Sequence, residues 1–179
     1  MKIVGVPFVH TMGSKGSENS PKKILAEVGL NEFEEIEVDL TDIEESNNII
    51  HDRAKEIFAF EENCVFVGGD HSITYPLFSA FNEKYKDSYL IIFDAHADAD
   101  NASRNTKNEE WVRAIVEDGF NPKNIILVGT RKVWEVEKDF VEKSGIKVFS
   151  EFDDSEAVAD YITEKINGKP TYISVDVDA

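Results

Sequence analysis

The feature that most constrains the fold is the run Leu90–Phe93, in which four apolar residues follow one another without alternation. Such a run is typical of a strand buried on both faces, as in a parallel sheet covered by helices. Directly after it, Asp94, His96 and Asp98 occupy every second position, so in extended chain their side chains leave on one side. Because ligands of open α/β sheets bind beyond the carboxyl ends of strands, these residues are candidates for a site.

The residues of this candidate site also indicate what it would bind. Two carboxylates and an imidazole that converge on one point repel one another and are poorly solvated unless a cation lies between them. The stretch therefore favours a metal site. An acidic loop that simply follows a strand is the alternative that this stretch alone leaves open.

Strand and helix patterns alternate along the whole chain. Apolar runs predict strands at 2–6, 35–40, 64–67, 90–93, 124–128, 146–149 and 171–175. Apolar residues at helical spacing predict helices between them, at 20–28, 47–60, 73–81, 111–116, 133–144 and 155–166. This alternation predicts an α/β fold of three layers, α/β/α, with a mainly parallel, doubly wound sheet. No linker interrupts the pattern, so we expect a single domain over residues 1–179.

The charge of the chain limits its partners. Acidic residues outnumber basic ones 36 to 19, giving a formal charge of −17, which argues against binding nucleic acid or an anionic membrane and is compatible with cationic ligands. The one cysteine, Cys64, excludes an internal disulfide, and its apolar neighbours indicate a buried structural residue. No apolar run approaches the roughly 20 residues that span a bilayer, and no signal peptide precedes the first strand, so we expect a cytoplasmic protein.

Two further strand ends carry residues of the same chemical kind. Gly68-Gly69-Asp70-His71-Ser72 follows the strand at 64–67 and places His71 at the turn into a helix. Ser174-Val175-Asp176-Val177-Asp178 ends the last strand with two carboxylates at alternate positions. In a parallel sheet all three strand ends lie at one edge, although a single histidine at the start of a helix is often structural.

The three sequences Gly-Gly-Asp-His-Ser, Asp-Ala-His-Ala-Asp and Ser-Val-Asp-Val-Asp, in this order, resemble the ureohydrolase family, which includes arginase, agmatinase and formimidoylglutamase. The opening Gly5-Val6-Pro7-Phe8 is also similar to that family. The resemblance covers essentially the whole chain and implies an arginase-like fold. It also implies that the C-terminal part of the family domain is absent, because the chain stops at Ala179, within the third motif.

The resemblance implies a binuclear manganese hydrolase. Its two Mn²⁺ ions would be held by six residues, namely His71, Asp94, His96, Asp98, Asp176 and Asp178. Carboxylates with imidazoles suit this ion, and two such cations make hydroxide available near neutral pH. The metal-bridging hydroxide, hydrogen-bonded by Asp98 as the catalytic residue, would attack the guanidinium or formimidoyl carbon of a small linear amine or amino acid. Urea or an analogous product would leave, and the family also suggests a homo-oligomer.

The chain departs from the family pattern where many members carry a proton-shuttle histidine. Asn108 stands there and cannot exchange a proton, so the leaving amine would take its proton from water, Glu109 or Glu110. The C-terminal loops that hold the substrate are also absent. The alternative is therefore a metal-binding, non-catalytic relative or a ligand sensor. A third interpretation, a deacetylase-like hydrolase, is disfavoured because deacetylases differ in their metal motifs.

Overall fold

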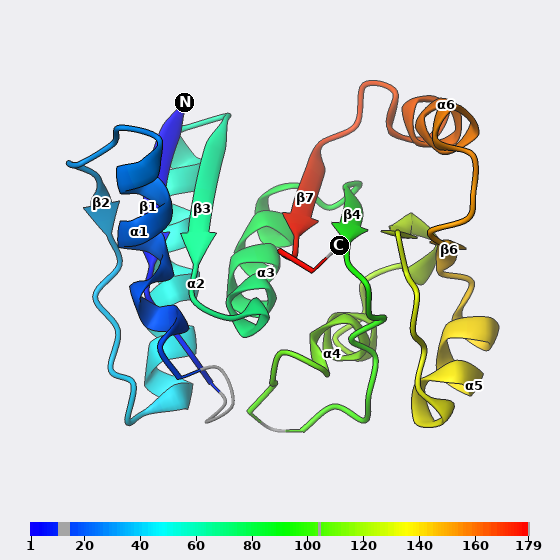
Figure 1. Cartoon of the computed structure of the whole chain (residues 1–179), viewed down its shortest axis with the longest axis horizontal. Helices are drawn as coiled ribbons and strands as arrows, with labels where there is room; N and C mark the ends of the chain where they lie inside the picture. Colours follow the sequence, from blue (N-terminus) through cyan, green and yellow to red (C-terminus); the bar gives the residue numbers. More distant parts are fainter. Residues whose placement is uncertain (11–14, 104, 179) are drawn as a thin grey trace. The chain divides into compact units, whose positions relative to one another are not determined.

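The computed structural model describes residues 1–10, 15–103 and 105–178 (Figure 1). The chain forms two compact units. The first unit comprises Met1–Lys84 with Ser103–Asn108, and the second unit comprises Tyr85–Ala102 with Glu109–Ala179. Every strand pairing in the described residues is parallel, and the fold is a three-layer α/β/α arrangement with parallel sheets.

The first unit contains a three-stranded sheet in the order β2-β1-β3. Its strands are β1 (Lys2–Val6), β2 (Glu34–Glu35) and β3 (Cys64–Gly68). Its helices are α1 (Ser20–Glu27), α2 (Ile43–Phe60) and α3 (Thr74–Lys84), with short 3₁₀ helices at Ser17–Asn19 and His71–Ile73. Cys64 is the first residue of the edge strand β3 and is half-buried rather than buried, and burial raises the pKa of its thiol.

Helices cover both faces of this sheet, with α1 in front of β1 and α2 behind it in Figure 1. A side chain built at Gly5 would lie 3.4 Å from Cβ of Pro21 in α1. On the other face, the ring of Phe58 in α2 packs against that of Phe66 in β3, with 5.6 Å between centroids. Gly5 pairs with Val67, whose side chain points opposite to that of Phe66. The two contacts therefore lie on opposite faces.

The second unit contains a four-stranded sheet in the order β6-β5-β4-β7. Its strands are β4 (Tyr89–Phe93), β5 (Ile125–Val128), β6 (Lys147–Phe149) and β7 (Thr171–Val175). Its helices are α4 (Trp111–Glu117), α5 (Glu135–Ser144) and α6 (Ser155–Ile166), with a short 3₁₀ helix at Pro122–Asn124. Val158 of α6 packs on one face of the sheet with Ile126 and Phe149.

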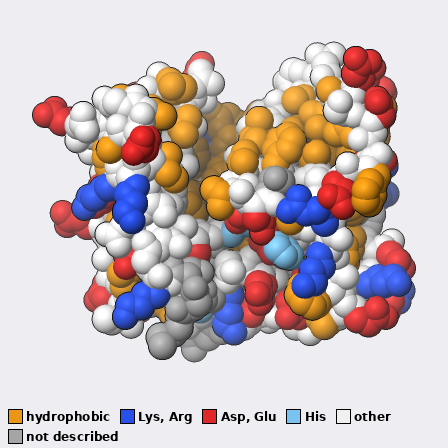
Figure 2. All heavy atoms as spheres, viewed as in Figure 1, with side chains coloured by type: hydrophobic (Ala, Val, Ile, Leu, Met, Phe, Trp, Pro, Cys, Tyr) orange, Lys and Arg blue, Asp and Glu red, His pale blue; other side chains and the backbone are white. Residues whose placement is uncertain are grey.

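The position of β4 inside this sheet confirms the prediction from its apolar run. Leu90, Ile91 and Ile92 are at most 2% exposed, as expected of a strand covered on both faces. By contrast β7 forms an edge of the sheet, and its Ile173 and Val175 are 57% and 67% exposed. Figure 2 shows apolar side chains gathered over the strands of the second unit.

The structure differs from the sequence prediction at several element boundaries. The strand predicted at 35–40 is reduced to Glu34–Glu35. Helix α2 begins four residues before the predicted position 47, because the Asp42 side chain caps it by accepting from the amide of Glu45 (3.0 Å). Within the described residues, no helix has both the length and the apolar character needed to cross a membrane.

Candidate metal centre

The carboxyl ends of β4 and β7 bring two predicted ligands together in the second unit. Phe93 pairs with Val175 in the parallel register, and the next residues are Asp94 and Asp176. The amide of Asp176 donates to the carbonyl of Phe93 (2.9 Å), so the pairing continues one residue beyond the strands. As a result Asp94 and Asp176 each offer a carboxylate oxygen within 4.8 Å of the other.

A second group in the same unit consists of Asp94, His96 and Asp178, whose ligand atoms lie within 4.8 Å of one another. Nδ1 of His96 is 3.2 Å from Oδ2 of Asp178 and 3.5 Å from Oδ1 of Asp94. Asp94 is buried, whereas the side chains of His96 and Asp178 are partly exposed. Two carboxylates beside an imidazole nitrogen match the preference of a divalent cation such as Mn²⁺ for oxygen and nitrogen ligands.

Hydrogen bonds to the main chain fix the segments that carry these predicted ligands. The amide of His96 donates to Oδ1 of Asp94 (2.7 Å), and the carbonyl of Ala95 accepts from the amides of Arg131 and Lys132, both at 2.9 Å. The Arg131 guanidinium donates to the carbonyl of Asp178. The segment after β5 therefore supports the segments after both β4 and β7.

Asp98 is held differently from the other predicted ligands of this unit. It is 7% exposed, and its Oδ2 accepts a hydrogen bond from Nε1 of Trp111 (2.8 Å). Its carboxylate does not belong to any group of described acidic and histidine side chains whose potential ligand atoms all lie within 4.8 Å of one another. Its roles as a metal ligand and as the catalytic residue stay predictions.

His71 belongs to the first unit, where it begins the 3₁₀ helix His71–Ile73. The preceding Asp70 accepts from the amides of His10 (2.9 Å) and Ser72 (3.0 Å) and from the Ser72 hydroxyl. A side chain at Gly69 would lie 2.1 Å from the carbonyl oxygen of Phe8, so only glycine fits this turn. The turn thus fixes the backbone at His71, whose role as a ligand stays a prediction.

The residues at the position of the proton shuttle differ in exposure. Asn108 is half-buried, and its Oδ1 is buried without a hydrogen-bond partner in the part of the chain that the structure describes. Glu109 is exposed, whereas Glu110 is only 7% exposed. Of the two predicted acids, Glu109 is therefore the one whose side chain is open to solvent.

The structure adds two residues that the sequence pattern did not identify. Trp111 was expected only as an apolar residue of a helix, yet its indole contacts Asp98. The buried carboxylate of Glu137 accepts from the amide of Ala99 (2.9 Å), the residue after Asp98. A tryptophan at the start of a helix and an acid in a first turn are common, so neither residue gave a signal in the sequence.

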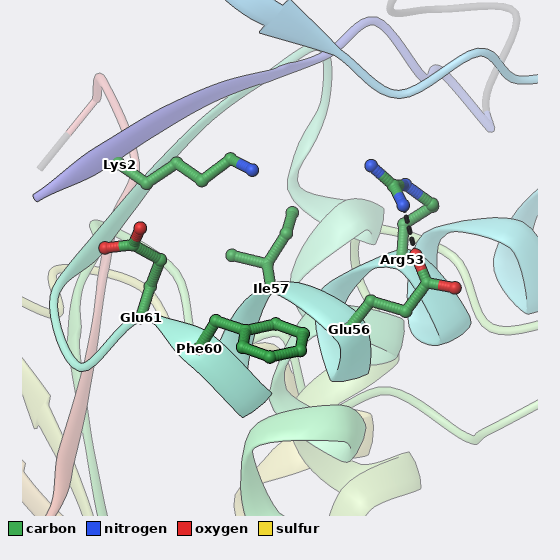
Figure 3. A pocket seen from close by; sticks show the side chains of 6 residues that line it. All are labelled: Lys2, Arg53, Glu56, Ile57, Phe60 and Glu61. Atoms are coloured by element: carbon green, nitrogen blue, oxygen red, sulfur yellow. Dashed lines mark hydrogen bonds and ion pairs between the residues drawn. The ribbon is translucent and has the colours of Figure 1, made fainter.

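The first unit also contains a pocket of about 390 Å³ that is separate from the predicted metal ligands (Figure 3). Lys2 lines it at the beginning of β1, so it lies at the opposite end of the strands from the turn that carries His71. Its charged groups balance one another, for example in the ion pair between Arg53 and Glu56. It contains none of the predicted ligands.

Comparisons with known proteins agree with the chemistry of these residues. The model of the Arginase family matches residues 1–179. An uncharacterised 32.2 kDa protein of Methanothermus fervidus is 30% identical over 98% of this chain and 67% of its own length. The agmatinase of Bacillus cereus is 25% identical with the same coverage of both chains.

Solved structures show the same fold. The proclavaminate amidino hydrolase of Streptomyces clavuligerus has a TM-score of 0.87 at 21% identity, over 97% of this chain and 67% of that one. The formimidoylglutamase of Bacillus subtilis has a TM-score of 0.81 at 20% identity, over 99% and 64%. The chain thus spans about two thirds of the length of its relatives. The family match over the entire sequence, together with the 30% identical relative, establishes that this chain belongs to the arginase family, the ureohydrolases.

Proposed function

We propose that this chain carries the binuclear manganese site of a hydrolase that cleaves a carbon–nitrogen bond in a guanidino or formimidoyl compound. The observation that supports it best is the convergence of Asp94, His96 and Asp178, with Asp176 beside Asp94, in a member of the arginase family. One related solved structure, a formiminoglutamase variant of Trypanosoma cruzi, is described with Mn²⁺.

Three roles in the proposed reaction can be assigned to residues of this chain: binding the metal ions, orienting the nucleophile and supplying a proton. The residues that would hold the ions are His71, Asp94, His96, Asp98, Asp176 and Asp178. When bound, a pair of divalent cations lowers the pKa of a water that they share and supplies a hydroxide nucleophile near neutral pH. Asp98 would accept a hydrogen bond from that nucleophile and so orient it toward the substrate carbon. Glu109, being exposed, would pass a proton from solvent to the leaving amine.

The substrate class follows from what the relatives share. Those relatives include agmatinases and a guanidinobutyrase of Pseudomonas aeruginosa that is 27% identical to this chain. Agmatine and guanidinobutyrate, the compounds from which these relatives are named, each carry a guanidino group, which is a planar cation. A formal charge of −17 attracts such cations over long range. We therefore assign the chain a small, linear, cationic substrate.

The experiment that tests this proposal is a calorimetric titration of the metal-free chain with Mn²⁺. We expect two binding sites in the unmodified chain and a loss of binding in Asp94→Ala and His96→Ala. The matched control is Asp139→Ala, which removes an exposed aspartate of the same unit that pairs with Lys143. If the unmodified chain binds no more Mn²⁺ than Asp94→Ala, the proposal is wrong.

A second arm separates catalysis from binding. Urea and ammonia release would be measured in the presence of Mn²⁺ with agmatine, arginine, guanidinobutyrate, guanidinopropionate and formimidoylglutamate. Turnover of any of these compounds supports the hydrolase. Two occupied metal sites without turnover of any of them would favour the non-catalytic relative or sensor that Asn108 suggests.

A further inference from the structure

The segment 98–100 is anchored by residues from two helices that the ligand pattern does not include. We propose that Trp111 is a positioning residue, whose indole N–H fixes the orientation of the Asp98 carboxylate for metal binding. This inference deepens the proposed function and rests on it. It concerns only residues of the second unit, since Asp98, Trp111 and the groups around them all belong to that unit.

The contact between the two side chains is direct and shielded from water. Nε1 of Trp111 lies 2.8 Å from Oδ2 of Asp98, and Trp111 is 0% exposed. An indole N–H can only donate and carries no charge, so it holds the carboxylate without neutralising it as an arginine or lysine would. A hydrogen bond to an ionised acceptor is stronger than a neutral one, particularly in a buried environment. The contact therefore restricts rotation of the Asp98 side chain.

The backbone of Asp98 is held by the same helix. Asp98 has a φ of 49°, and among the described residues no other residue except glycine has a positive φ. Its carbonyl accepts from the amide of Val112 (3.0 Å), the residue after Trp111. The start of α4 thus binds both the main chain and the side chain of Asp98. A strained backbone of this kind persists only where its surroundings determine it fully.

The two residues after Asp98 are fixed as well. The amide of Ala99 donates to Oε1 of Glu137, whose Oε2 accepts from the amide of Trp134 (2.6 Å). The amide of Asp100 donates to the carbonyl of Glu109 (3.0 Å). With the chain fixed on the C-terminal side of Asp98, the hydrogen bond from the indole adds a direct restraint on the direction of the carboxylate. A ligand that is already oriented loses less freedom when an ion binds.

The expected effect is that of losing a hydrogen-bond partner of a metal ligand, which typically lowers metal affinity by roughly 10- to 100-fold. Calorimetric titration of the full chain with Mn²⁺ should show this loss for Trp111→Phe at one of two sites. Trp134→Phe, which changes a half-exposed tryptophan of the same unit, should bind like the unmodified chain.

Lost packing is a competing explanation, because Trp111 is buried. Ile115→Ala controls for it, since Ile115 is 3% exposed, lies one turn further along α4 and carries no polar side-chain atom. We expect Ile115→Ala to lower the melting temperature without weakening Mn²⁺ binding. If Trp111→Phe binds Mn²⁺ as tightly as Trp134→Phe, or no more weakly than Ile115→Ala, the positioning role is wrong.

A second measurement keeps the inference testable if Trp111→Phe does not fold. In the variant Trp134→Phe, Trp111 is the only tryptophan. Added Mn²⁺ should change the fluorescence emission of Trp111, and the midpoint of this change should equal the midpoint of Mn²⁺ binding in the calorimetric titration. Asp98→Asn in this background should weaken that response. If Mn²⁺ binds but the fluorescence of Trp111 does not change, the ion lies away from Asp98. This result would overturn the inference but not the proposed function. A chain that binds no Mn²⁺ overturns both.

Discussion

Two loops that carry predicted ligands, 68–72 in the first unit and 94–100 in the second, are stabilised in different ways. In loop 68–72 the anchoring side chain belongs to the loop itself, since Asp70 accepts from the amide and hydroxyl of Ser72 and from the amide of His10. In loop 94–100 the anchoring side chains come from outside the loop, as shown by Glu137, which accepts from the amide of Ala99, 38 residues before it.

This difference teaches how each loop depends on the rest of its unit. In loop 68–72 the glycines and the carboxylate of the loop itself contact the main chain of residues 6–10, so substitutions within the loop should be the damaging ones. Loop 94–100 is determined by side chains of α4 and α5, so substitutions far from the ligands should disturb it. Both loops follow a strand of a parallel sheet, but only in the first does the anchoring carboxylate belong to the loop itself.

The largest effect is expected from Gly69→Ala in loop 68–72. The new Cβ would lie 2.1 Å from the backbone oxygen of Phe8, and a backbone group cannot move aside as a side chain can. Overpacking in a closely packed region costs about 1–3 kcal/mol and occasionally more, and we expect the upper end here. Urea unfolding followed by circular dichroism measures the loss of unfolding free energy.

Gly68→Ala is the matched control in the same loop. Its Cβ would lie 1.9 Å from Cδ1 of Ile73, the far end of a flexible side chain that can adopt another rotamer. We therefore expect Gly68→Ala to cost less than Gly69→Ala. If the two variants lose equal stability, contact with the backbone of Phe8 is not what requires glycine at this turn.

Glu137→Gln tests the remote anchoring of loop 94–100. Glu137 is 1% exposed and accepts two backbone amides, from Ala99 and Trp134. Glutamine offers one acceptor oxygen, and its amide group would face one of these donors. A lost hydrogen bond to a buried charged group costs about 1.5–3 kcal/mol. We expect a loss in this range, with faster hydrogen exchange at the amide of Ala99.

Glu135→Gln controls for the loss of a negative charge in the first turn of α5. Glu135 is exposed in that same turn. Its charge interacts with the helix dipole, which contributes about 0.3–1 kcal/mol at an exposed site. An effect of Glu137→Gln no larger than that of Glu135→Gln would contradict the remote anchoring of the loop.

The fold was predictable from the sequence because its signals are periodic. The apolar run Leu90–Phe93 indicated a strand covered on both faces, and the alternation of strands and helices indicated the three-layer class. Pairing between strands depends on atoms far apart in sequence. For this reason the short length of β2 was not predicted.

The same distinction holds for the candidate site. The period of two placed Asp94, His96 and Asp98 after one strand, and the structure brings Asp94 and His96 together with Asp178. No pattern in the sequence could indicate that the indole of Trp111 would donate a hydrogen bond to the Asp98 carboxylate, because this bond depends on the position of α4 in the folded unit. The roles of His71 and Asp98 stay predictions.

Asp70→Asn removes the central acceptor of loop 68–72. One oxygen of Asp70 accepts from Ser72 and the other from the amide of His10. Asparagine keeps one acceptor and turns an amide group toward the second donor, which costs about 1–2 kcal/mol for a half-buried site. Asp42→Asn is the matched control in the same unit, because asparagine caps a helix about as well as aspartate. Equal losses would show that Asp70 acts only as a helix cap.

Ser72→Ala should have the smallest effect of this series and shows whether the local bonds act together. The Ser72 hydroxyl donates to Oδ1 of Asp70, which also accepts the amide of Ser72, so the amide bond survives the substitution. Removing one neutral donor costs about 0.5–1.5 kcal/mol.

The double variant of Asp70 and Ser72 sharpens this test. Since the two side chains share one hydrogen bond, the double variant should lose less stability than the two single losses added together. Unfolding free energies of the four proteins in this cycle measure the coupling. Strict additivity would mean that the hydroxyl contributes independently of Asp70, and the loop would then depend on more distant partners, as loop 94–100 does.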